Sequence, residues 1–318
     1  MGIIKTILTK SIGILRKEGI SGLLKRRREY YKAYMPLRYH LYYYIYSLLS
    51  HKKTAIRNIQ ENKMLLNLYD TGLSKQLFFY DYREPNCTEL TKKLLKPGMT
   101  ILEIGANIGY YTMIESKAIG KKGIIHAFEP SSKNFEFLEK NVSLNNYDDR
   151  VKLYNSAVSN VSGTTKLFTP KKMNRSNMLS DNGGKYESVK SVIIDDFFGK
   201  FFNPNFIRMD VEGFEYYIFD GMINTLKRSK NCIIYMEYHP YLIDKDGLDY
   251  HKPIELLFSL GFRPIYIVKE YGSLLEETFS YYEPNNVFFE FLEKKKLLPP
   301  DYTHGMGLFL VKDKKEIK

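Results

Sequence analysis

A short glycine turn with an acid before it is the part of this chain best suited to chemistry. Gly105 and Gly109 follow a β-branched run, with Asn107 between them and Glu103 just before. A dinucleotide site needs G-x-G-x-x-G so that a pyrophosphate can approach the helix N-terminus, and Asn107 breaks that spacing. Glu103 would repel a pyrophosphate but could hold a cationic ligand, directly or through water. The turn therefore predicts an adenosyl cofactor that carries a positively charged amino acid.

A second acid lies where the next strand is predicted to end. Glu129 comes 20 residues after Gly109 and directly before a proline. At the carboxyl end of the neighbouring strand, a carboxylate can accept hydrogen bonds from both ribose hydroxyls of an adenosine. Sites for NAD and for S-adenosylmethionine (SAM) share this feature, so it predicts a nucleotide without choosing between them. The alternative is that Glu129 caps the helix that follows.

Two further strand ends carry acids. Asp210 and Glu212 lie at a strand-to-helix turn, and if the strand persists they share a face that suits a divalent metal ion or a general base. Glu237 and His239 alternate onto one face of the next strand, where an imidazole can take a proton from an attacking hydroxyl. A structural role for His239 is the alternative. For Glu215 we favour a simple contact with the helix dipole.

The elements that must position these residues alternate between β-branched runs and helical spacing. This is the rhythm of an α/β fold with a doubly wound, mostly parallel sheet, whose strands meet at one carboxyl edge. Strands are predicted at 100–104, 123–128, 151–155, 206–210, 232–238, 264–268 and 304–311. Helices are predicted at 84–95, 108–119, 132–146, 213–228 and 253–260.

Other segments fit this alternation less well. The short alternating runs 64–69 and 77–80 predict a small hairpin before the first sheet strand. Residues 160–195 interrupt the rhythm with turns and extended pieces, and we expect them near the carboxyl edge, where ligands bind in open α/β sheets. Residues 269–304 show no firm period.

Positive charge is concentrated at the N-terminus. The chain has 48 basic and 36 acidic residues and a net charge of +12, and residues 1–63 hold 14 of the basic residues but three of the acidic ones. We therefore expect a basic, Tyr-rich helical extension over 1–62 and a main domain over 63–318. Residues 1–60 suit a helix lying on an anionic membrane. A helical hairpin packed on the main domain is the open alternative, and nucleic acid is disfavoured because no recognised motif accompanies the charge.

The cysteines and the length of the apolar runs indicate the cellular compartment in which the protein works. Cys87 and Cys232 show no C-x-x-C spacing, which argues against a disulfide framework or a zinc site. No apolar run reaches the roughly 18 residues that span a bilayer, and the N-terminus has no clear signal-peptide pattern. We expect a cytoplasmic protein whose membrane contact, if the extension makes one, is on the cytoplasmic face.

Four segments together point to a known family. They are Arg83-Glu84-Pro85, Glu103-Ile-Gly-Ala-Asn-Ile-Gly109, Phe128-Glu129-Pro130 and Asp210-Val-Glu-Gly-Phe-Glu215. With them the chain resembles the FkbM family of SAM-dependent methyltransferases, and the resemblance runs from about Asp70 to Val311. The last segment is the hallmark of that family.

The resemblance implies the class I SAM-methyltransferase (Rossmann-like) fold and O-methylation of a hydroxyl on a sugar, glycan or similar natural-product acceptor. It implies SAM as the cofactor, with a divalent metal as a variant of the site. Asp210 and Glu212 are implied as site residues. The implied cofactor residues are Glu103, Gly105, Asn107 and Gly109 at the methionine end, Glu129 at the ribose, and Ser156 and Ala157 beside the adenine.

The expected reaction needs a base, because an aliphatic hydroxyl is a poor nucleophile until its proton is removed. We nominate His239 or Asp210, with metal-assisted deprotonation at Asp210, Glu212 and Glu237 as a variant. One alternative function is an NAD-dependent sugar dehydrogenase or epimerase, which predicts a Tyr-x-x-x-Lys pair, but Tyr266 and Lys269 have only two residues between them and lie on a late strand. Another is a non-catalytic binding module that keeps the cofactor pocket.

Overall fold

The structure is a computed structural model, which describes residues 53–70, 72–169, 185–269, 274–275, 285–300 and 305–312. By its internal contacts the chain divides into two units, residues 1–54 and 55–318. Residues 1–52 of the expected extension lie outside the described residues, so its helices and its membrane contact stay predictions. No helix in the described part of the chain is long and apolar enough to span a bilayer.

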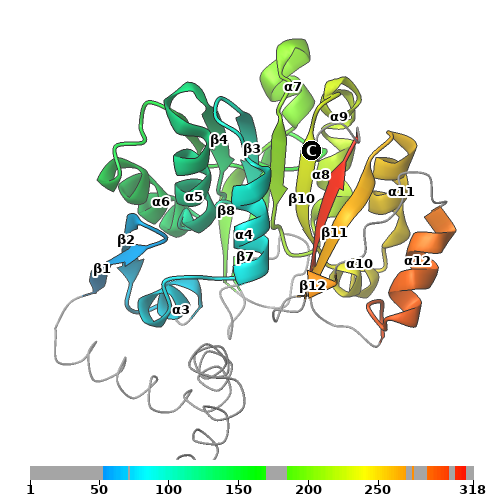
Figure 1. Cartoon of the computed structure of the whole chain (residues 1–318), viewed down its shortest axis with the longest axis horizontal. Coiled ribbons are helices and arrows are strands. Elements are labelled where there is room, and N and C mark those ends of the chain that lie inside the picture. The colour runs from blue at the N-terminus through cyan, green and yellow to red at the C-terminus, as the bar shows by residue number, and fades with distance from the viewer. Residues whose placement is uncertain are drawn as a thin grey trace, which may run out of the picture. The chain divides into compact units, whose positions relative to one another are not determined.

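An eight-stranded sheet forms the centre of the unit 55–318, in the order β12-β11-β13-β10-β9-β3-β4-β5 (Figure 1). The strands from β10 to β5 are parallel, whereas β13 runs antiparallel between β10 and β11. The predicted α/β fold with a mostly parallel sheet is confirmed. The strands are β3 (Thr100–Ile104), β4 (Ile124–Phe128), β5 (Val151–Tyr154), β9 (Phe206–Met209), β10 (Ile233–Tyr238), β11 (Arg263–Lys269), β12 (Leu274–Leu275) and β13 (Met306–Val311).

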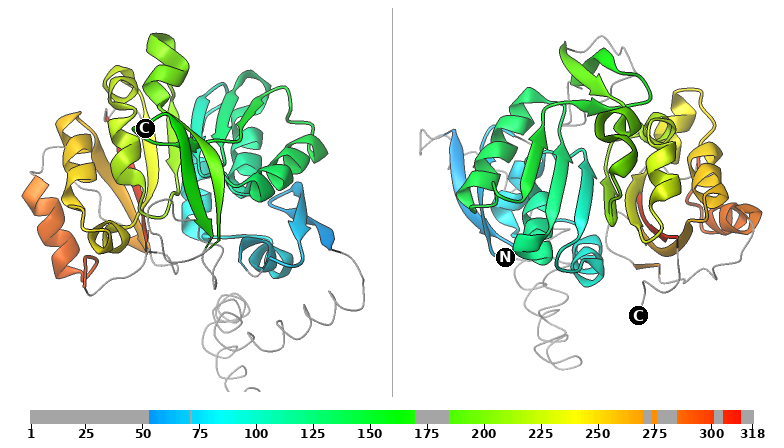
Figure 2. Two further views of the ribbon diagram at one scale, coloured as in Figure 1. Left: turned by 180° about the vertical axis from the view of Figure 1, so that it is seen from behind. Right: turned by 90° about the horizontal axis from the view of Figure 1, so that it is seen from above.

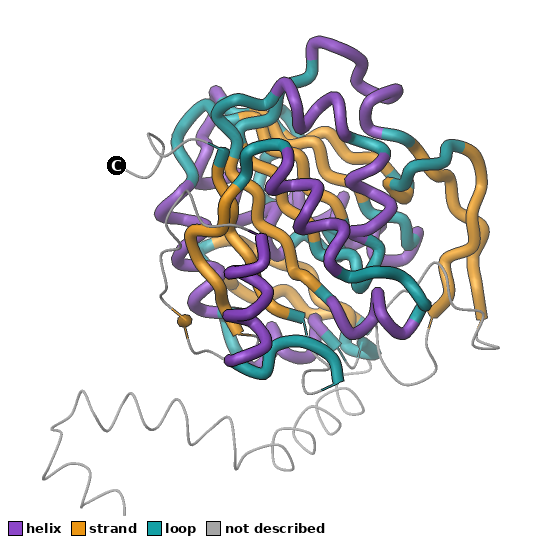
Figure 3. The backbone as a smooth tube through the Cα atoms, turned by 90° about the vertical axis from the view of Figure 1, so that its right-hand side faces the viewer, coloured by secondary structure: helices purple, strands orange, loops and turns teal. Residues whose placement is uncertain are grey.

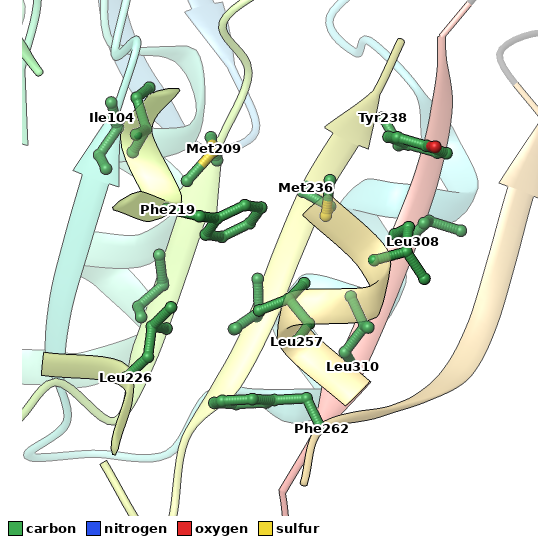
Figure 4. Close-up of a cluster of buried hydrophobic side chains, with 14 of the residues drawn as sticks. Ile104, Met209, Phe219, Leu226, Met236, Tyr238, Leu257, Phe262, Leu308 and Leu310 are labelled. Carbon is green, nitrogen blue, oxygen red and sulfur yellow. The ribbon is translucent and has the colours of Figure 1, made fainter. Parts of the chain in front are cut away.

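Helices cover both faces of this sheet (Figures 2 and 3). One face carries α4 (Pro85–Leu94), α5 (Tyr110–Ile119) and α6 (Ser132–Leu144), and the other carries α8 (Glu215–Asp220), α9 (Ile223–Arg228), α11 (His251–Ser259) and α12 (Asn285–Lys294). Strand side chains alternate between the faces, so Glu103 reaches α5 while Ile104 joins the large core opposite. Figure 4 shows this core, with Met209 of β9 near Phe219 of α8.

The carboxyl ends of the parallel strands meet at the lower edge of the sheet in Figure 1. There β10 runs directly into α10 (Pro240–Lys245), and α3 (Leu73–Phe79) lies at the same level. At the opposite edge α7 (Ile194–Phe198) precedes β9, and two 3₁₀ turns, Gly120–Lys122 and Gly199–Phe201, complete the connections. The predicted meeting of the strand ends at one edge is therefore confirmed.

The small hairpin before the sheet is displaced from its predicted place. It consists of β1 (Thr54–Ile59) and β2 (Asn62–Asn67), whereas residues 77–80 belong largely to α3. The prediction of a strand there is wrong because tertiary packing buries one helical face, with Leu77 and Phe78 inside. The two residues between β1 and β2 have positive φ although neither is a glycine, so the usual turn signal is missing.

Two later segments also differ from the prediction. The single helix over 213–228 is divided into α8 and α9, because the Asp195 carboxylate accepts hydrogen bonds from the backbone N–H groups of Asn224 (2.8 Å) and Thr225 (2.7 Å) and so starts a new helix. Within 269–304, α12 forms where no period was recognised. Its described buried residues are Phe288, Phe289 and Leu292.

The interruption at 160–195 contains a small separate sheet. Strands β6 (Ala157–Val158), β8 (Lys185–Val192) and β7 (Gly163–Thr169) pair in that order, with β8 parallel to β6 and antiparallel to β7. The extended pieces expected here are thus confirmed, and residues 170–184 between them lie outside the described residues.

Candidate active site

The predicted glycine turn joins β3 to α5 at the carboxyl edge. Gly105, Asn107 and Gly109 have φ values of 85°, 53° and 90°, all in the left-handed region. A Cβ atom at Gly105 would lie 2.2 Å from the backbone oxygen of Asp210, so only glycine fits there. The turn expected to hold a cofactor therefore packs directly against the residue expected to act as a base.

Glu129 follows β4 and is bonded to this turn. Its carboxylate accepts hydrogen bonds from the backbone N–H groups of Asn107 (2.8 Å) and Ser131 (3.0 Å) and a longer one from the Asn134 side chain (3.4 Å). Burial raises the pKa of Glu129 to about 7, although these hydrogen bonds oppose the rise. The residue that caps α6 is Ser131, so the interpretation of Glu129 as a helix cap is wrong.

Ser156 and Ala157, expected beside an adenine, follow β5. The side chain of Asn155 just before them donates a hydrogen bond to the backbone carbonyl of Glu129 (2.9 Å), which ties this segment to the same edge. Both residues are buried, and Ala157 belongs to the core of the small sheet. The hydrogen bond from Asn155 brings this segment beside Glu129, which suits the expected role, and contact with an adenine stays a prediction.

Glu103 lies beneath α5 rather than at the open edge. It is buried, it accepts a hydrogen bond from the Thr112 hydroxyl (2.7 Å), and it neighbours Arg208, which pairs with Glu115 (2.5 Å). Burial and the charge of Glu115 raise the pKa of Glu103 well above its usual range. The Glu103 carboxyl is thus held by a hydrogen bond from the first turn of α5, and its contact with a ligand stays a prediction.

Asp210 and Glu237 form a pair at the ends of adjacent strands. Their side chains share a hydrogen bond. Burial raises the pKa of Asp210 well above its usual range, and the charge of Glu237 adds to the rise. Burial would also raise the pKa of Glu237, but the charge and hydrogen bond of His239 lower it to about 2. The proton of the pair therefore resides on Asp210, whose side chain is also the more exposed of the two, at 30% against 9%.

His239 lies among three carboxylates. Its Nδ1 is 3.0 Å from Glu215 Oε1, and its Nε2 is 3.5 Å from Glu237 Oε1 and 3.6 Å from Glu212 Oε2. Burial would lower the pKa of the ring, but the charge of Glu237 and the hydrogen bond to Glu215 raise it well above its usual range. A protonated imidazole has no lone pair with which to accept a proton, so this geometry disfavours His239 as the base.

Strand alternation explains the placement of one of the two residue pairs that were predicted to share a strand face. Glu237 and His239 lie beside each other as expected, with His239 one residue beyond the end of β10. Because β9 ends at Met209, Asp210 and Glu212 are placed by the turn instead, and Glu212 adopts a left-handed φ of 53°.

Two residues at the carboxyl edge were not predicted as site residues from the sequence. Glu215, interpreted as a partner of the helix dipole, is fully buried and orients His239. A Cβ atom at Gly305 would lie 2.5 Å from His239 Nε2 and 2.6 Å from Glu237 Oε1, so the backbone just before β13 covers both side chains. A glycine beside a strand pattern is the signal that could have found this close approach.

Arg83 is a third residue that the sequence analysis did not place at the site. It precedes α4 and therefore comes from outside the parallel sheet. Its Nη2 lies 3.7 Å from Asp210 Oδ2, and its Nε donates to Glu84 Oε1 (2.5 Å). Two cations, Arg83 and His239, thus lie among the acids of this edge.

The predicted metal ligands do not gather into a complete set. Across the described ranges, no group of three or more His, Cys, Asp and Glu side chains is arranged to hold a metal ion. Asp210 pairs with Arg83 and Glu237, and Glu212 faces His239. A metal role for Asp210 and Glu212 stays a prediction.

Several solved structures are similar to this chain at low identity. A putative transferase from Pyrococcus horikoshii is 13% identical, with 87% of this chain and 84% of that chain covered and a TM-score of 0.47. A SAM-dependent O-methyltransferase from Thermotoga maritima is 12% identical, covering 81% and 77% at a TM-score of 0.40. Aeropyrum pernix fibrillarin with natively bound S-adenosyl-L-methionine is 13% identical, covering 72% and 75% at 0.41. Similarities this distant assign neither activity nor substrate.

Comparison with family profiles gives a more specific result. No curated protein matches the chain. The profile described as the methyltransferase FkbM domain matches residues 103–264, just over half of the 318 residues. This range includes the glycine turn, Glu129, Asp210, Glu237 and His239. The chain belongs to the FkbM methyltransferase family.

Proposed function

We propose that this protein is a SAM-dependent O-methyltransferase that acts on a hydroxyl of a sugar, glycan or similar natural-product acceptor. The observation that carries the proposal is the backbone contact between the glycine turn and Asp210. That contact sets the expected cofactor loop beside Asp210, a carboxyl whose pKa is raised toward the range of a general base, as transfer from a sulfonium to a weakly acidic hydroxyl requires. Family membership supports methyl transfer, and the site supports oxygen as the acceptor atom.

The residues present fit a bound SAM. Glu129, already oriented by the turn, is suited to accept hydrogen bonds from the two ribose hydroxyls, beside the turn from Gly105 to Gly109 at the start of α5. SAM supplies a methyl group that is already activated for transfer. The acids at this edge outnumber Arg83 and His239, and their excess negative charge favours a cationic cofactor.

Asp210 is suited to remove the proton of the acceptor hydroxyl. It is the more exposed acid of its pair, and it must first lose the proton that its raised pKa retains. Arg83 on one side favours the ionised form. His239, held by Glu215, keeps Glu237 ionised and fixed. The residues of the edge thus bind, orient and accept a proton while the methyl group passes to oxygen.

Glu129 makes cofactor binding depend on pH. Because its pKa is raised to about 7, it is largely protonated at pH 6 and ionised at pH 8. An ionised carboxylate accepts hydroxyl hydrogen bonds more strongly, so the affinity for SAM should rise between these pH values. In Glu129→Gln we expect roughly tenfold weaker binding with no such pH dependence, because a bond to a charged group contributes about 1.5 kcal/mol or more. Calorimetric titration at pH 6, 7 and 8 measures both effects.

Cofactor choice separates the proposal from the dehydrogenase alternative. Tyr266 and Lys269 lie on β11, four strands away from β3 in the sheet order and far from Glu129 along the sheet. We expect calorimetry to show binding of SAM and S-adenosylhomocysteine but not of NAD. Binding of NAD without SAM would refute the proposal, and binding of SAM without any methyl transfer would favour a binding module instead.

A further inference from the structure

Arg83 and Glu84 form a connection between the glycine turn and the acids of the catalytic edge. They end the loop before α4, on a segment that contributes no strand to the large sheet. Arg83 Nε donates to Glu84 Oε1 (2.5 Å), and Arg83 Nη2 lies 3.7 Å from Asp210 Oδ2. One guanidinium therefore faces two carboxylates through two different nitrogens, a planar arrangement that the single nitrogen of a lysine ammonium does not reproduce.

The backbone of Arg83 is fixed by the first residue of α5. Its N–H donates to the Tyr110 hydroxyl (2.9 Å), and its carbonyl accepts a hydrogen bond from Thr88 (2.9 Å). The Tyr110 hydroxyl also reaches that carbonyl (3.1 Å). Because Tyr110 follows Gly109 directly, the segment is attached to the end of the glycine turn.

Glu84 is attached to the next residue of the same helix. Its Oε2 accepts a hydrogen bond from the Tyr111 hydroxyl (2.8 Å), while its Oε1 holds Arg83. Glu84 also has a φ of 45°, a left-handed conformation that costs a residue with a Cβ about 1–3 kcal/mol. Such strain persists where the surrounding contacts over-determine it, and here those contacts aim the Arg83 side chain at Asp210.

We propose that Arg83 is a positioning residue for the methyl transfer, which with Glu84 holds the Asp210 carboxyl in line with the glycine turn. The proposal rests on the proposed function, because it assigns Arg83 a role at the same site. A misplacement of about 1 Å at a reacting group can cost on the order of a hundredfold in rate, so a residue that fixes such a group affects turnover more than binding.

Four variants of the full chain test this role, with neutral methyl glycosides and radiolabelled SAM as the probes. In Arg83→Gln we expect kcat to fall roughly tenfold to a hundredfold while the acceptor KM and the Kd for SAM stay within about threefold. Arg83→Lys, which keeps the charge but loses the planar fork, should lie between wild type and Arg83→Gln. Tyr111→Phe removes one hydroxyl and should lower kcat by a smaller factor in the same direction.

Arg150→Gln is the matched control. Arg150 also pairs with the acid next to it in sequence, Asp149 (2.9 Å), but it precedes β5 at the amino edge of the sheet. We expect its kinetics to match wild type.

Three results would overturn the role of Arg83. The first is an unchanged kcat in Arg83→Gln, and the second is a rise in KM without a fall in kcat. The third is weaker SAM binding or a lower melting temperature that accounts for the whole fall in activity. A wild type that binds SAM but methylates no glycoside would instead refute the proposed function, and the role of Arg83 would fall with it.

Discussion

Asp210→Asn is expected to lower methyl transfer by roughly a hundredfold to ten-thousandfold, because the variant retains the shape of the side chain but cannot accept a proton. The affinity for SAM should stay within about threefold, since the glycine turn contacts the backbone of residue 210 and not its carboxyl. Steady-state kinetics and calorimetry on the same preparation measure the two quantities.

The pH dependence of turnover gives a second test with Asp210→Asn. In the wild type the rate should rise with pH, because Asp210 must lose the proton that its raised pKa retains. In Asp210→Asn that rise should disappear. Asp149→Asn, which changes an exposed carboxylate away from the carboxyl edge, is the control and should behave as wild type. Turnover by Asp210→Asn near the wild-type rate would show that another group is the base.

Gly105→Ala should be the most disruptive substitution in the turn. A Cβ atom at Gly105 would lie 2.2 Å from the backbone oxygen of Asp210, and the φ of 85° adds a separate cost. The left-handed conformation and the forced shift of packed backbone together predict a loss of about 2–4 kcal/mol in the free energy of unfolding. Because the shift moves both the turn and the base, binding of SAM and turnover should fall together.

Gly98→Ala isolates the conformational part of this effect. Gly98 has nearly the same φ, 86°, but a Cβ atom there would meet nothing within 4 Å. The expected loss is about 1 kcal/mol, with normal binding of SAM. Denaturant unfolding of both variants gives the difference. Equal losses in the two proteins would mean that the contact between Gly105 and Asp210 does not constrain the site.

The sequence predicts the site best where it lies on the parallel strands. Glu129 and Asp210 each follow directly on a strand, Glu237 is the penultimate residue of another, and a βαβ rhythm requires the ends of such strands to meet at one edge. Their closeness could therefore be derived from local patterns alone. The glycine turn belongs to the same class, because positive φ and close packing both require small residues.

The remaining site residues depend on contacts that no local pattern encodes. Arg83 reaches the edge from a loop outside the sheet, and Gly305 lies there because β13 inserts antiparallel between β10 and β11. Glu215 has the position of an ordinary helix-dipole acid, and only its complete burial beside His239 distinguishes it. Burial would lower the pKa of His239, but its neighbours Glu237 and Glu215 raise it. Because the sequence does not show these contacts, it predicts a histidine of ordinary pKa that can act as a base.

Transfer of a labelled methyl group tests the central claim most directly. The full chain would be incubated with SAM carrying an isotopically labelled methyl group and with a panel of neutral glycosides, and the products would be analysed by mass spectrometry. We expect the label on an oxygen of one or more sugars, with no labelled product from Asp210→Asn. Label on nitrogen or carbon, or no transfer by a protein that binds SAM, would contradict the assignment of an O-methyltransferase.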